Sequence, residues 1–123
     1  MSPLSPAATA LVRLMSELPR GPRREGVFAV WLTLRVAEDL LLVPPPPERG
    51  SKRRVAALEQ RLSSLGFPAP LRRALVATLA ELREARRDRV GQALLLLVAP
   101  AREILGPEAS EIVARAARSA AQH

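Results

Sequence analysis

The segment LLLVPPPPERGSKRRV, residues 40–55, marks the point where a long apolar helix must stop and a basic helix begins. Proline fixes φ and lacks an amide hydrogen, so helices tolerate it in their first turn but not in their interior. The four consecutive prolines are therefore expected to end the first helix and to form a stiff corner over residues 44–50. All twelve prolines of the chain fall where a helix could begin or end.

The helix before this corner is expected to be the central helix of the molecule. Residues 22–43 are apolar over an arc of about 220° of the helical wheel, so neighbouring helices must cover them. The corner is therefore predicted to join helices of one domain. Three large apolar side chains, Phe28, Trp31 and Leu42, lie on the remaining polar stripe. They are expected either to extend the internal packing or to form an interface with a second subunit or a partner.

The intervals between prolines predict an all-α, single-domain bundle of about five helices within residues 1–123. The predicted helices span 6–18, 22–43, 52–65, 70–99 and 107–121, with Ser5 and Ser51 as N-caps and frayed ends at 1–4 and 122–123. Residues 70–99 form one helix or two, since Gly91 favours a kink near 88–91. The run ALLLLV, residues 93–98, has no polar face and is expected to be fully buried.

The sequence lacks the side chains from which catalytic sites are usually built. Cys and Tyr are absent, the only His is His123, and the only Asp residues are Asp39 and Asp88. Glu38 and Asp39 are adjacent, which separates them by about 100° on a helix. The six glycines are too dispersed to form a phosphate-binding loop. We therefore expect no enzyme, no metal, no cofactor and no small-molecule substrate.

No segment has the composition of a secretory signal or of a transmembrane helix. The N-terminal MSPLSPAATA lacks a basic stretch followed by a long apolar one. Residues 27–43 carry Arg35, Glu38 and Asp39, and the run ALLLLVAPA is too short to span a bilayer. We expect a cytoplasmic protein without a membrane partner.

The net charge of +7 is concentrated in the middle of the chain. Residues 48–90 contain 11 basic and 5 acidic residues, whereas residues 1–47 contain 5 and 4, and residues 91–123 contain 3 of each. Arg outnumbers Lys 18 to 1, which is typical of a GC-rich genome and weakens arguments from Arg count alone. The excess charge therefore lies in the pair of helices predicted at 52–65 and 70–99.

These two helices are joined by a short connection, so they should be antiparallel neighbours with basic groups meeting at one end. The predicted anion-binding or nucleic-acid-binding surface consists of Lys52, Arg53, Arg54, Arg83, Arg86 and Arg87. Further cations stand at helix starts, where the macrodipole favours acids instead; these are Arg23, Arg24, Arg72 and Arg73. The alternative interpretation is a solvated, salt-bridged surface, because Glu81, Glu84 and Asp88 are interspersed with the cations.

The leading functional hypothesis is a non-catalytic helical protein-interaction or scaffold/regulatory protein that self-associates as a homodimer. The alternative is a nucleic-acid-associated protein that binds the phosphate backbone through the basic helix pair. The same helix pair could also bind an acidic partner protein. The scarcity of aromatic residues argues against base stacking. Pro44 to Arg49 also matches the P-x-x-P-x-R pattern of peptides that bind SH3-type grooves, although four prolines are equally suited to a simple corner.

Overall fold

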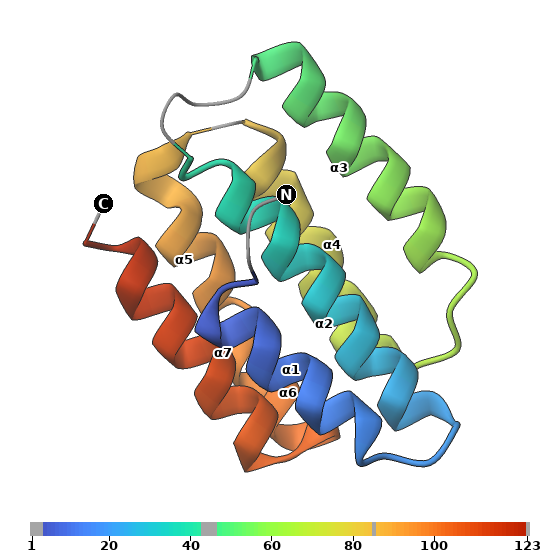
Figure 1. The fold of residues 1–123 in the computed structure, drawn as a ribbon. Helices are drawn as coiled ribbons and strands as arrows, with labels where there is room; N and C mark the ends of the chain where they lie inside the picture. Colours follow the sequence, from blue (N-terminus) through green and yellow to red (C-terminus); the bar gives the residue numbers. More distant parts are fainter. Residues whose placement is uncertain (1–3, 43–46, 85, 123) are drawn as a thin grey trace.

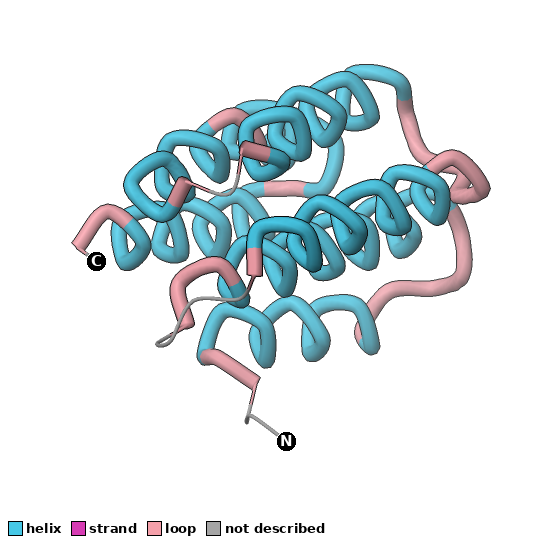
Figure 2. Tube along the Cα trace, turned by 90° about the horizontal axis from the view of Figure 1, so that it is seen from above, coloured by secondary structure: helices cyan, strands magenta, loops and turns pink. Residues whose placement is uncertain are grey.

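The computed structural model describes residues 4–42, 47–84 and 86–122. Helices and loops make up this described part of the chain, and no strand occurs in it (Figure 2). The all-α prediction is confirmed. The fraying expected at residues 1–3 and 123, and the expected conformation of the prolines at 44–46, lie outside the described residues.

The described chain contains more helical segments than the five predicted. They are α1 (Pro6–Ser16), α2 (Pro22–Asp39), α3 (Glu48–Leu62), α4 (Ala69–Arg83), a 3₁₀ turn η1 (Arg87–Arg89), α5 (Val90–Leu95), α6 (Val98–Leu105) and α7 (Pro107–Ala120). The predicted helix 70–99 is divided by η1, which confirms the break near residues 88–91. The fragment AREIL, residues 101–105, lies between the predicted helices 70–99 and 107–121 and forms the second half of α6.

The helix after the proline corner begins earlier than predicted. Glu48 is the first residue of α3 and Pro47 its N-cap, so the corner does not extend to Gly50 and Ser51 does not cap the helix. Ser51 lies instead in the interior of α3, where its side chain is buried. The α2 helix ends at Asp39, before the predicted end at Val43. By contrast, the Ser5 cap is confirmed, since its Oγ accepts a 3.1 Å hydrogen bond from the amide of Ala8.

The α2 helix occupies the centre of the molecule, as its wide apolar arc predicted (Figure 1). It contacts α1, α3, α4, α5 and α6, and α7 packs mainly against α5, α6 and α1. The core between these helices is built from aliphatic side chains that are almost completely buried; the largest are Leu11, Leu34, Leu71, Leu75, Leu79, Leu82, Leu94, Leu97 and Leu105. The α3 helix makes its main contacts with α2 and α4 and lies at the edge of the molecule.

Two glycines allow helices to approach more closely than other residues would permit. A Cβ atom on Gly26 of α2 would lie 2.7 Å from Cδ2 of Leu105 and 3.1 Å from Cδ2 of Leu71. A Cβ atom on Gly91 of α5 would lie 3.0 Å from the backbone oxygen of Ala117 in α7. Gly91, which weakened the prediction of a single helix over residues 70–99, thus also allows a close approach between α5 and α7.

Candidate functional site

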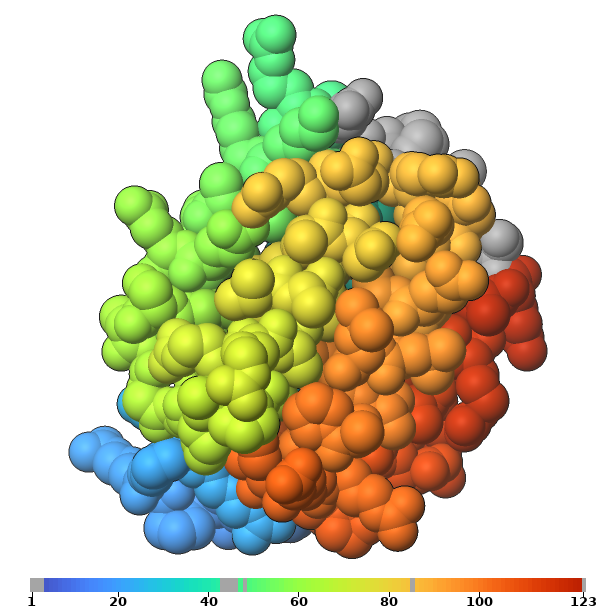
Figure 3. Space-filling model, turned by 180° about the vertical axis from the view of Figure 1, so that it is seen from behind, coloured from blue at the N-terminus to red at the C-terminus, as the bar shows by residue number. Residues whose placement is uncertain are grey.

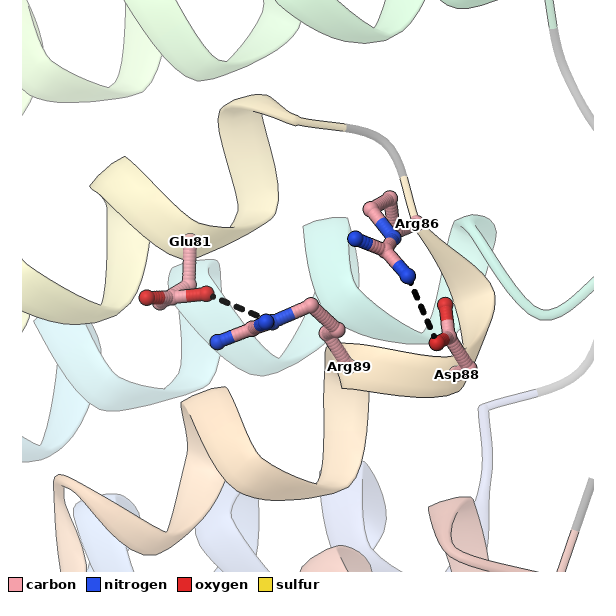
Figure 4. A network of polar contacts seen from close by, with 4 residues as sticks. All are labelled: Glu81, Arg86, Asp88 and Arg89. Atoms are coloured by element: carbon pink, nitrogen blue, oxygen red, sulfur yellow. Dashed lines mark hydrogen bonds and ion pairs between the residues drawn. The ribbon is translucent and has the colours of Figure 1, made fainter.

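The basic residues predicted to form one anion-binding surface are largely engaged with neighbours. Arg54 forms an ion pair with Asp39 at the end of α2, and Arg83 forms one with Glu59 of α3. Arg86 turns toward Asp88, at 3.1 Å, in the connection before α5 (Figure 4). These three guanidinium groups therefore present less free positive charge than the sequence suggested.

The remaining members of the predicted surface divide into two groups. Arg87 points inward and donates a 2.9 Å hydrogen bond from Nη2 to the backbone oxygen of Leu41. Lys52 and Arg53 are exposed on α3, where they border a shallow hollow together with Arg49. The next cation along the chain, Arg89, is paired with Glu81 at 3.1 Å (Figure 4).

Two arginines at helix starts donate hydrogen bonds to backbone carbonyls at the C-terminal end of another helix. Arg23, at the start of α2, donates from Nε and Nη2 to the backbone oxygen of Leu105, the last residue of α6, at 3.1 and 2.8 Å. Arg72, in the first turns of α4, donates to the backbone oxygens of Leu62 (2.8 Å), the last residue of α3, and of Leu65 in the loop that follows. Helix C-termini carry free carbonyls and a partial negative charge. A guanidinium group there donates hydrogen bonds to the carbonyls and is attracted by the negative charge.

The other two helix-start cations make no such contact in the described structure. Arg24 is half-buried and Arg73 is exposed. Arg72 also stacks over Phe67, with Cζ 4.4 Å from the ring centroid. Of the four cations singled out at helix starts, Arg23 and Arg72 therefore have a structural role.

Of the predicted interface residues, Phe28 and Trp31 lie together and Leu42 lies apart from them. Phe28 and Trp31 stack with ring centroids 6.1 Å apart and are half-buried on the side of α2 that faces α3. Leu42 is 46% exposed and lies beyond the other end of α2, in the wall of a separate cavity described below.

An open groove of about 720 Å³ runs between α2 and α3. We call it the α2/α3 groove; it is lined by Trp31, Leu32, Arg35, Val36, Arg54, Ala57, Leu58, Gln60 and Arg61. The guanidinium carbon of Arg35 lies 5.9 Å from the Trp31 ring centroid, and that of Arg61 lies 5.3 Å from the Phe28 ring centroid. Neither Arg35 nor Arg61 has an ion pair with any residue in the described part of the chain. The groove therefore combines apolar walls with two cations that have no acidic partner there.

The run ALLLLV, residues 93–98, is not fully buried, so the prediction of full burial is wrong. Leu95 is 56% exposed and Leu96 44% exposed, because the chain turns between α5 and α6 at this point and directs these side chains outward. Val76 of α4 is 59% exposed. The molecule viewed from behind shows α4 and α5 side by side on one face (Figure 3), and Thr78 Oγ1 of α4 donates to the backbone oxygen of Ala93 in α5 at 3.1 Å.

A second, more enclosed cavity of about 430 Å³ lies among α1, α2, α5 and α7. We call it the Glu38 cavity. Glu38 is half-buried in its wall, and this burial raises the pKa of the carboxyl group above 4.5 despite a hydrogen bond from the Ser5 hydroxyl. Across the cavity, Arg115 is paired with Glu111, whose pKa is lowered by hydrogen bonds from Arg115 and Arg118.

Over residues 4–42, 47–84 and 86–122, no group of three His, Cys, Asp or Glu side chains could hold a metal ion. No helix in the described part of the chain is long and apolar enough to cross a bilayer.

Comparison of the chain with family models, curated proteins and solved structures gives no match.

The sequence indicated some parts of these sites and missed others. Phe28, Trp31 and Arg35 share one stripe at helical spacing, which was the available signal for the groove. The opposite wall, with Ala57 and Arg61, depends on how α3 packs against α2 and has no signal in the local pattern. For the Glu38 cavity the sequence has no comparable signal, because nothing in the local pattern places α1 and α7 around Glu38.

Proposed function

We propose that this chain is a non-catalytic protein-interaction protein and that the α2/α3 groove binds an acidic helical segment of a partner protein. The observation that carries the proposal is the pairing of an apolar surface with Arg35 and Arg61, which lack acidic partners in the described structure. An amphipathic helix could lay apolar side chains on Trp31 and Leu32 and place carboxylates against the two guanidinium groups. The net charge of +7 favours encounter with an acidic partner.

The double variant Arg35→Glu/Arg61→Glu is expected to bind an acidic amphipathic peptide at least about tenfold more weakly than the unmodified protein, because charge reversal replaces attraction by repulsion. The measurement is fluorescence anisotropy with a labelled peptide of repeating Leu and Glu at helical spacing. The matched control is Arg13→Glu/Arg102→Glu, which changes the net charge equally at exposed positions on α1 and α6. Equal affinities for the two variants, or for a scrambled peptide, would refute the groove.

The exposed face of α4 and α5 supports self-association as a homodimer. Arg73, Ala77, Ala80 and Glu84 are exposed and follow one another at spacings of four, three and four residues, so they share one side of α4. Two copies of α4 packed antiparallel about a two-fold axis would bring Arg73 of each copy beside Glu84 of the other. The two alanines would allow close approach, and Val76, Leu95 and Leu96 would extend the contact.

We expect light scattering at several concentrations to show a dimer that dissociates on dilution. Arg73→Glu and Glu84→Arg should each weaken it, because each variant places like charges together. The double variant Arg73→Glu/Glu84→Arg should restore it, since the pairing is then only exchanged. A protein that is monomeric at all concentrations, or a double variant no better than either single one, would exclude this dimer.

Nucleic-acid binding is the second candidate, favoured by the cationic hollow on α3 formed by Arg49, Lys52 and Arg53. Such binding would be directed to phosphates and would weaken as salt is raised. The same anisotropy titration with duplex DNA at two salt concentrations separates the candidates. Duplex binding that is lost in Arg49→Glu/Arg53→Glu but retained in Arg35→Glu/Arg61→Glu would favour nucleic acid over an acidic peptide.

A further inference from the structure

The Glu38 cavity has the size and lining of a small-molecule site. Its volume of about 430 Å³ falls within the range of about 300–1,000 Å³ common for ligand pockets, which are mostly apolar with a few polar groups. Its walls come from helices far apart in the sequence, and the side chains that face it are largely aliphatic; they include Ala10, Leu34, Leu42, Leu94, Ile112 and Ala116. The cavity shares no lining residue with the α2/α3 groove.

The charged groups around the cavity do not balance one another. Glu38 has no ion pair with any described residue, and a hydrogen bond with the Ser5 side chain only partly offsets its burial. On its own helix, Arg35 attracts and Asp39 repels it without direct contact. Arg115 on α7 lines the same cavity, but its guanidinium pairs with Glu111 at 3.2 Å. A half-buried carboxylate without a cation in direct contact is unfavourable, so a cationic ligand would gain from pairing with it.

We propose that the Glu38 cavity binds a small organic cation with an apolar body, of the class of aliphatic amines. The ammonium group would donate to the Glu38 carboxylate, and the hydrocarbon part would lie against Leu34, Leu94 and Ile112. An organic acid of the same shape would meet the unpaired carboxylate and be repelled. This site is independent of the proposed protein-binding groove, and each can fail without the other.

The test uses three ligands with the same tail and different heads: octylamine, octan-1-ol and octanoate. We expect isothermal titration calorimetry at neutral pH to show the amine binding at least about tenfold more tightly than the alcohol, and the acid more weakly still, since charge-assisted hydrogen bonds are the stronger ones. Glu38→Gln should lower the affinity for octylamine to that for octan-1-ol and leave the alcohol unchanged. Ala116→Phe should fill the cavity and weaken the binding of both.

The matched control is Glu103→Gln, which removes one exposed carboxylate on α6 at a distance from the cavity. It should bind all three ligands as the unmodified protein does, and circular dichroism should show each variant folded. Lowering the pH should weaken octylamine binding as Glu38 takes up a proton and loses its charge, and this loss should disappear in Glu38→Gln. Equal affinities for amine and acid, an unchanged affinity in Glu38→Gln, or no measurable binding of octylamine would each overturn the proposal.

Discussion

Leu75→Ala is expected to lower the free energy of unfolding by about 2–5 kcal/mol, the range found when a leucine is truncated in a close-packed core. Leu75 is 0% exposed and belongs to the side of α4 that also carries Leu71, Leu79 and Leu82. The truncation removes apolar contacts and leaves a cavity that the surrounding helices fill only partly. Urea unfolding followed by circular dichroism measures the change.

The next residue provides the matched control. Val76 is 59% exposed, so Val76→Ala should change the free energy of unfolding by no more than about 0.5 kcal/mol. This variant should be measured at low protein concentration, where a dimer through the same face is dissociated. If both variants lost the same stability, the orientation of α4 described above would be wrong.

Arg72→Met is expected to lower the free energy of unfolding by about 1.5–3 kcal/mol, the contribution of hydrogen bonds made by charged groups. Methionine keeps an unbranched apolar stem, but it cannot donate to the backbone oxygens of Leu62 at the end of α3 and of Leu65 in the loop that follows. It also loses the cation–π contact with Phe67. Thermal and urea unfolding of the single variant give the magnitude.

Arg73→Met is the control for this second experiment, because Arg73 has the same charge and an exposed side chain. Both variants should be measured at low protein concentration, where a dimer through Arg73 and Glu84 is dissociated. Its effect should stay within about 0.5 kcal/mol. Arg72→Lys should recover only part of the lost stability, since an ammonium group is not a planar fork that reaches two carbonyls at once. Equal losses for Arg72→Met and Arg73→Met would show that net charge matters and the carbonyl contacts do not.

The fold class was predictable because proline and the helical periodicity act locally. The Ser5 cap and the break near Gly91 were found from the same local rules. The start of α3 differs from the predicted one because Ser51 before a basic run resembles a cap, whereas the helix begins at Glu48, directly after the extended N-cap residue Pro47. The outward-facing Leu95 and Leu96 could not be predicted, since a uniform leucine run contains no information about which side is covered.

The positive charge was located correctly along the chain but its partners were not visible in the sequence. Arg23 and Arg72 lie near the N-terminus of their own helices, which is the positive end of the helix dipole. A cation is unfavourable there, and its presence suggested an anion site. In a bundle the start of one helix lies beside the end of another, and a long guanidinium side chain reaches across. The distance along the chain hides such contacts: Arg23 and Leu105 are 82 residues apart.

That separation has a consequence for the kinetics of folding. A contact between residues so distant along the chain forms only after the intervening helices have been brought together, and closing such a long loop carries an entropic cost. The same holds, over 46 residues, for Arg87 and Leu41. We therefore expect these arginine contacts to form late in folding, after the helices have assembled. Contacts that form after the transition state slow unfolding and leave the folding rate nearly unchanged.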